Sequence, residues 1–210
     1  MTQPGMLWRH VVINTHGTWL HGDERGFRSR GHRIHSSGDY RNPPPKGEHT
    51  GLLRYHRKRC RKEVIIPREF RRAIGQAIVD YLLSEGYRVL CVAVGKVHAH
   101  GVVELPIPSR VKRIIGEAKR HASRCVSRPI PGALWSAGGE FVAVEDADHL
   151  KAAYEYDLYK QGPGAWTWSW RDRSREGMFA RKRPPNRGAS APGPPVTRSG
   201  AAPRLPRRGR

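Results

Sequence analysis

Short runs rich in apolar and β-branched residues occur in three segments of the first half of the chain. Residues 7–15 (LWRHVVINT) are rich in β-branched side chains and predict a strand. Residues 87–94 and 97–105 predict two more strands, with Gly95-Lys96 between them as a tight turn. These segments therefore predict a strand followed later by a β-hairpin.

Helical spacing of apolar residues marks three other segments. Residues 67–84 begin with a proline suited to a first helical turn, and Gly86 follows their end. Residues 109–127 carry an apolar stripe with basic residues off it, and residues 146–160 start with Asp146 as a candidate N-cap. A short strand is expected within residues 134–144.

The order of these elements is strand, helix, strand, strand, helix, strand, helix. It predicts an α+β fold, a ferredoxin-like split βαβ antiparallel sheet with helices on one face. We expect residues 1–170 to form this domain, with a long polar loop at 22–51 that is either functional or mobile. Residues 171–210 form a basic tail rich in Pro, Gly and Arg, for which we expect disorder.

The charge balance narrows the choice of partner. Lysine and arginine number 39 against 18 acidic residues, a formal net charge of +21, which favours a nucleic acid over a membrane surface. Cys60, Cys91 and Cys125 are too far apart for a zinc knuckle or a disulfide framework. With no signal-peptide pattern and no membrane-length apolar run, we expect a soluble cytoplasmic protein without a membrane partner.

The valine-rich strand 97–105 contains two histidines, His98 and His100. Side chains at i and i+2 of a strand share one face, so this spacing offers two imidazoles to one divalent metal. The alternative is two polar side chains on a solvated sheet face. Glu104 shares that face and is predicted to be a surface charge rather than a ligand.

The last predicted helix contains three closely spaced tyrosines, Tyr154, Tyr156 and Tyr159, followed by Gln161. A tyrosine hydroxyl beside a metal-bound phosphate is a competent nucleophile, and the Gln161 amide oxygen could reach a metal where the helix ends. The alternative is that the tyrosines pack on the sheet with their hydroxyls in water.

Two further features could hold DNA. The helix 109–127 presents basic residues that could contact a phosphate backbone: Lys112, Arg113, Lys119, Arg120 and Arg124. The tryptophan-rich segment 165–171 could stack unpaired bases or could equally be an amphipathic strand that buries its aromatics. The sequence contains no Gly-x-x-x-x-Gly-Lys, Gly-x-Ser-x-Gly or His-Glu-x-x-His motif, which weighs against nucleotide hydrolases, serine hydrolases and zinc proteases.

Taken in order, these motifs resemble one family over residues 7–161. The His-x-His strand resembles the histidine–hydrophobic–histidine motif of single-tyrosine transposases of the IS200 type and of their relatives associated with repetitive extragenic palindromes (REP). The basic helix 110–124, the Gly132-Ala-Leu-Trp135 segment and a helix with a tyrosine before a polar stop follow in that family's order.

The resemblance implies a DNA transposase-like endonuclease that nicks and joins single-stranded or hairpin DNA. A tyrosine, here Tyr156 with Tyr154 and Tyr159 as rivals, would form a 5′-phosphotyrosine link and free a 3′-hydroxyl. Magnesium or manganese would be held by His98 and His100 with Gln161, and the active form would be a homodimer. Activity should fall below a pH of roughly 6.5, because metal-binding imidazoles must be neutral.

The chain departs from the family in three respects. Asp157 follows the tyrosine where an aliphatic residue is usual, Gly95-Lys96-Val97 replaces the common Pro-Asn, and the loop 22–51 is longer than in compact members. Two other functions therefore stay open. One is an inactive, basic nucleic-acid-binding descendant, and the other is a metal-dependent phosphodiesterase that uses activated water.

Overall fold

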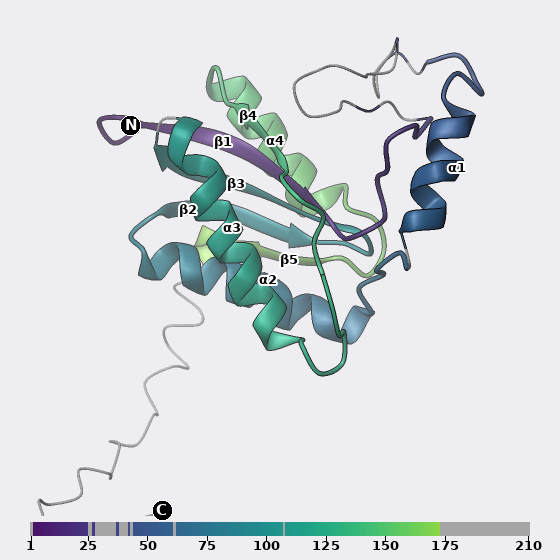
Figure 1. Ribbon diagram of the computed structural model, residues 1–210. Coiled ribbons are helices and arrows are strands. Elements are labelled where there is room, and N and C mark those ends of the chain that lie inside the picture. Colours follow the sequence, from purple (N-terminus) through teal and green to yellow (C-terminus); the bar gives the residue numbers. More distant parts are fainter. Residues whose placement is uncertain are drawn as a thin grey trace, which may run out of the picture.

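A five-stranded antiparallel sheet forms the centre of the molecule (Figure 1). The computed structural model describes residues 2–24, 27, 37, 42, 44–60, 62–106 and 108–172. The strands are β1 (Met6–Asn14), β2 (Arg88–Val94), β3 (His98–Pro106), β4 (Glu140–Ala143) and β5 (Trp166–Ser169), in the order β4-β1-β3-β2-β5. Much of the expected loop 22–51, and the expected tail from residue 173 on, lie outside the described residues.

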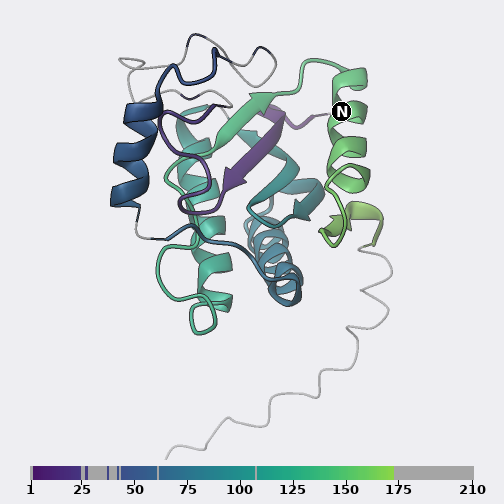
Figure 2. The same cartoon turned by 90° about the vertical axis from the view of Figure 1, so that its right-hand side faces the viewer.

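Helices cover both faces of this sheet (Figure 2). The helices α2 (Arg68–Ser84) and α3 (Pro108–Cys125) pack together on one face, whereas α4 (Ala147–Tyr159) contacts β2, β3 and β5 from the other. The predicted α+β ferredoxin-like sheet is confirmed. The two helices of the split βαβ unit share one face as predicted, and α4, which follows that unit, lies on the opposite face.

Successive side chains of β1 and β3 point to opposite faces of the sheet, which explains why helices pack on both faces. Val11 and Ile13 of β1 and Val103 of β3 enter the main core beneath α2 and α3. Val102 and the aromatic ring of Trp8 point the other way and pack in a smaller cluster with α4. The even-numbered positions of the two central strands therefore face α4, and His98 and His100 are among them.

The helix α1 (Thr50–Arg59) has no counterpart among the predicted elements. Its sequence, TGLLRYHRKR, contains little apolar material, and none of its residues is buried. Hydrophobic periodicity therefore gave no signal for it. The helix stands beyond the end of the sheet where β1 finishes (Figure 1).

The tryptophan-rich segment forms β5 and a following single 3₁₀ turn, Trp170–Asp172. Trp168 is buried in the main core, and Trp166 packs against it. Gly75 of α2 leaves room for the Trp166 ring, since a Cβ at that position would collide with it. Of the two interpretations of this segment, the amphipathic strand with buried aromatics holds for these two residues.

The prediction that Glu104 is a surface charge is wrong. Its side chain is fully buried, accepts a hydrogen bond of 2.7 Å from the backbone nitrogen of Gln3 and pairs with Arg88 at 3.1 Å. The register places it opposite Trp8, toward the end of β3 that is far from His98. Across the described residues, every helix falls short of the length and apolar character that a membrane crossing requires.

Candidate functional site

Three histidines lie on the α4 side of the two central strands. In the antiparallel register of β1 and β3, Asn14 pairs with His98, Val12 with His100, and His10 with Val102. His10 and His100 are therefore diagonal neighbours on one face. Their rings stack with centroids 5.6 Å apart, and the His98 ring meets His100 edge-on at 4.4 Å.

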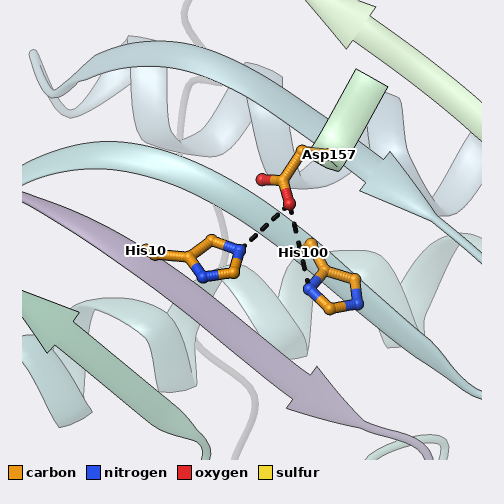
Figure 3. Close-up of side chains that lie close together, drawn as sticks. All are labelled: His10, His100 and Asp157. Carbon is orange, nitrogen blue, oxygen red and sulfur yellow. Dashed lines mark hydrogen bonds and ion pairs between the residues drawn. The ribbon is translucent and has the colours of Figure 1, made fainter. Parts of the chain in front are cut away.

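The helix α4 brings a carboxylate onto these histidines. Asp146 caps the start of α4, as predicted, by accepting a 2.7 Å hydrogen bond from the His149 backbone nitrogen. One helical face then packs on the sheet, and Asp157 on that face is completely buried. Its Oδ1 atom lies 3.0 Å from Nε2 of His10 and 3.9 Å from Nδ1 of His100 (Figure 3).

His100 is buried without a hydrogen-bond partner in the described part of the chain. Only 8% of its surface is exposed, and neither ring nitrogen makes a hydrogen bond there. Burial, together with the neighbouring His98 and His10, lowers the pKa of His100 to about 3. The imidazole is therefore neutral at physiological pH, which is the form that binds a metal.

Asp157 is buried as well. Burial raises the pKa of its carboxyl group, although the hydrogen bonds from His10 and Cys91 act in the opposite direction. The Cys91 thiol donates to Oδ2 of Asp157 at 3.6 Å, and burial beside this carboxylate raises the pKa of Cys91. A cation beside Asp157 would favour its ionised form, so the arrangement suits a bound metal.

Two donor groups meet at His100. The nitrogen and oxygen donors of His10, His100 and Asp157 all lie within 4.8 Å of one another and could hold a metal ion. On the other side, Nε2 of His98 lies 3.4 Å from the amide oxygen of Gln161. The orphaned nitrogens of His100, together with imidazole and oxygen donors on both sides, fit a divalent metal.

Tyr156 is the tyrosine that reaches the histidines. Its ring meets His100 edge-on at 5.7 Å and His10 at 6.3 Å, and 44% of its surface is exposed. Tyr154 instead hydrogen-bonds through its hydroxyl to Ser169 at 2.8 Å, and Tyr159 is 76% exposed at the helix end. Gln161 donates a 3.1 Å hydrogen bond to the Tyr156 carbonyl, which ties the helix end to the histidine side.

An open pocket of about 470 Å³ gives access to this group. Histidines, Tyr156 and the segment after β1 form its walls. Its lining residues are His10, Val12, Asn14, Thr18, Trp19, Val97, His98, His100, Glu140 and Tyr156. All three histidines line it and Asp157 does not, so a substrate in the pocket can reach the imidazoles but not the carboxylate.

The basic residues predicted to bind DNA lie on α3, on the sheet face opposite the histidines. Lys119 donates hydrogen bonds of 2.6 and 2.7 Å to the carbonyls of Ser136 and Gly138, and burial lowers its pKa. Arg120 pairs with Glu117 within the helix. Lys112, Arg113 and Arg124 are exposed on α3.

The structure brings together four residues that the sequence predicted for the site: His98, His100, Tyr156 and Gln161. His10 and Asp157 were not predicted. His10 is at the same strand face as Trp8 and Val12, and only the β1–β3 register shows that it is a neighbour of His100. Asp157 falls four residues after the buried Ala153, so a carboxylate on the apolar stripe of α4 was the available signal.

Comparisons with known proteins give a similarity to solved structures but none to a family model or a curated protein. A solved structure of a REP-associated tyrosine transposase bound to a REP hairpin is similar, with 12% sequence identity and a TM-score of 0.38. The match covers 73% of this chain and 64% of that chain. At this identity and TM-score the similarity concerns fold and does not place the chain in that family.

Proposed function

We propose that this protein is a metal-dependent enzyme that nicks and rejoins single-stranded DNA through Tyr156. The observation that carries the proposal is the position of Tyr156, whose exposed ring lies against His100 at the wall of an open pocket. A nucleophile, a buried neutral imidazole and access for a substrate are the parts that a phosphodiester transfer requires.

The proposed metal ligands are His98, His100 and Gln161. His10, His98 and His100 all line the pocket, whereas Asp157 does not. His10 stacks on the His100 ring and is hydrogen-bonded to Asp157, so this pair would hold the ring in place. Magnesium or manganese bound there would polarise a phosphate oxygen as a Lewis acid and orient the phosphate. The mixed nitrogen and oxygen donors suit manganese in particular.

Tyr156 supplies the covalent chemistry. Its hydroxyl gives up a proton to water as its oxygen attacks phosphorus, forming the tyrosine–phosphate bond. The bond between phosphorus and the 3′ oxygen breaks, and that oxygen takes a proton from water. The products are a 5′-phosphotyrosine and a free 3′-hydroxyl, and the reverse attack by a 3′-hydroxyl restores a phosphodiester.

The test uses a labelled hairpin oligonucleotide with a single-stranded flank, incubated with protein and manganese or magnesium. We expect a covalent protein–DNA adduct that survives denaturation. It should be lost in Tyr156→Phe and retained in the matched variants Tyr154→Phe and Tyr159→Phe. Loss in Tyr154→Phe with retention in Tyr156→Phe would refute the assignment of the nucleophile.

Two other outcomes would replace the proposal. A free 5′-phosphate product without an adduct would indicate a phosphodiesterase that activates water. Tight, salt-sensitive binding with no cleavage by any metal, unchanged in His98→Ala and His100→Ala, would indicate a nucleic-acid-binding protein without catalysis. The predicted homodimer is tested separately by sedimentation equilibrium of the full chain.

A further inference from the structure

The helix α1 presents a cationic surface. A surface of this kind was predicted for α3 from the sequence. Four of its residues, Arg54, Arg57, Lys58 and Arg59, are exposed, and the helix contains no acidic residue. Arg54 and Lys58 are four residues apart and therefore lie on one face of the helix. Such a surface matches the charge of a phosphate backbone.

The segment between β1 and α1 connects this helix to the histidine pocket. Gly17 and Gly22 lie so close to residues of and after α1 that a Cβ on either would collide with them. Between these two glycines, Thr18 and Trp19 line the histidine pocket. Thr18 also lines a neighbouring hollow of about 350 Å³ whose wall includes Arg57 of α1. The surface from α1 to His98 is thus continuous.

This segment is held firmly at its start. The Thr15 side chain is fully buried, and its one hydroxyl hydrogen is shared between the carbonyl of Val64, at 2.6 Å, and that of Val97, at 3.0 Å. Thr18 in turn donates to the Thr15 carbonyl at 2.9 Å. Trp19, which is 37% exposed, is therefore presented at the pocket by an anchored turn.

From this placement we propose that single-stranded DNA runs from α1 across Trp19 to Tyr156. Arg57, on the wall of the hollow beside Thr18, and the neighbouring exposed Arg54 and Lys58 contact its phosphates. One unpaired base stacks on the Trp19 indole next to the reacting phosphate. The inference rests on the proposed function and deepens it by locating the path of its substrate. It replaces α3 and the β5 tryptophans, because α3 is on the opposite sheet face and Trp166 and Trp168 pack in the core.

The first test measures the salt dependence of binding to a fluorescein-labelled oligothymidylate by anisotropy. All proteins carry Tyr156→Phe and are kept in EDTA, so neither metal nor cleavage contributes. The double variant Arg54→Gln/Lys58→Gln removes two phosphate-binding charges and should reduce the slope of log K against log salt by about 1.4, at ~0.7 for each charge. The matched α3 pair Lys112→Gln/Arg113→Gln should keep the wild-type slope.

The second test addresses Trp19 with the same probe. Loss of one base stack, worth ~1–3 kcal/mol, predicts about five- to 150-fold weaker binding for Trp19→Ala, with Trp19→Phe in between. Trp170→Ala is the control, because Trp170 is 50% exposed in a different part of the surface, beside β5. An abasic nucleotide at the stacked position should weaken wild-type binding but have little further effect on Trp19→Ala.

A slope that falls in the α3 pair and not in the α1 pair would overturn the path, as would wild-type affinity in Trp19→Ala. These failures are distinct from failure of the proposed function. The adduct assay depends on Tyr156 and metal, whereas these binding measurements use neither. Circular dichroism of each variant confirms that the comparison is between folded proteins.

Discussion

Burial of His100 predicts an acid sensitivity that can be measured without knowing the DNA target. The folded-state pKa of about 3 lies below the ordinary value of 6.5, so between these values the unfolded chain binds one more proton than the folded protein. Stability linked to His100 is therefore complete above pH 6.5 and is lost as pH falls toward 3. The expected loss is about 1.4 kcal/mol for each pH unit.

The perturbation is His100→Asn, which removes the titrating ring. Between pH 6.5 and roughly pH 4.5, the wild type should lose roughly 2 kcal/mol of unfolding free energy more than the variant does. The raised pKa of Asp157 has the opposite effect on stability, since its folded form holds a proton longer as pH rises. Asp157 is retained in the variant, so a contribution of this sign is present in both proteins.

The assay is urea denaturation followed by circular dichroism in EDTA at several pH values. The absolute stability of His100→Asn matters less than the slope of the difference between the two proteins. His121→Asn, an exposed histidine on α3, controls for the loss of a histidine from the chain. A difference between wild type and His100→Asn that does not change with pH would refute the buried, neutral state of His100.

Three other predictions concern Asp157, Lys119 and the binding of manganese. Asp157→Ala should lower the unfolding free energy by ~1–3 kcal/mol, because it leaves His10 and Cys91 without their hydrogen-bond acceptor. Asp157→Asn should lower it by less. Thermal melts in which Asp157→Ala is as stable as wild type would contradict this. Lys119→Met should lower the unfolding free energy by ~1–3 kcal/mol in the same melts, because the hydrogen bonds to Ser136 and Gly138 are removed. Its binding of single-stranded DNA should stay at the wild-type level. Weaker binding with unchanged stability would instead make Lys119 a DNA contact. Manganese should raise the melting temperature of wild type but not that of His100→Asn. At a manganese concentration one hundred times its dissociation constant, the gain in unfolding free energy should be ~2.7 kcal/mol. In the same titration, Gln161→Ala tests one donor group and His10→Ala the other, and the variant with the larger loss identifies the ligands.

Local sequence patterns were sufficient for four of the five strands and for α2, α3 and α4, while β5 was one of two open interpretations of its segment. The β-branched runs of β1 and β3 and the apolar stripes of α2 and α3 are signals carried by neighbouring residues, and the structure has these elements within a few residues of the predicted bounds. The spacing of His98 and His100 likewise placed both on one strand face, because a period of two needs no tertiary information.

Features that depend on tertiary contacts were not predictable in the same way. His10 joins the site only through the register of β1 on β3, and Glu104 is buried only because Arg88 and the Gln3 backbone meet it from other segments. The helix α1 has no buried residue and so lacks the periodic pattern from which helices are predicted. The sequence favours Lys119 as a DNA contact, but the loop that follows α3 binds its ammonium group through two backbone carbonyls.

The central claim is that Tyr156 becomes covalently linked to DNA, and mass spectrometry of the adduct tests it most directly. Trypsin cleavage after Lys151 and Lys160 releases the peptide 152–160 (AAYEYDLYK), which contains all three candidate tyrosines. After nuclease trimming, fragment ions should carry the added nucleotide mass between Glu155 and Asp157, which assigns it to Tyr156. A nucleotide on Tyr154 or Tyr159, or a peptide that stays unmodified under conditions in which the DNA is cleaved, would contradict the proposed mechanism.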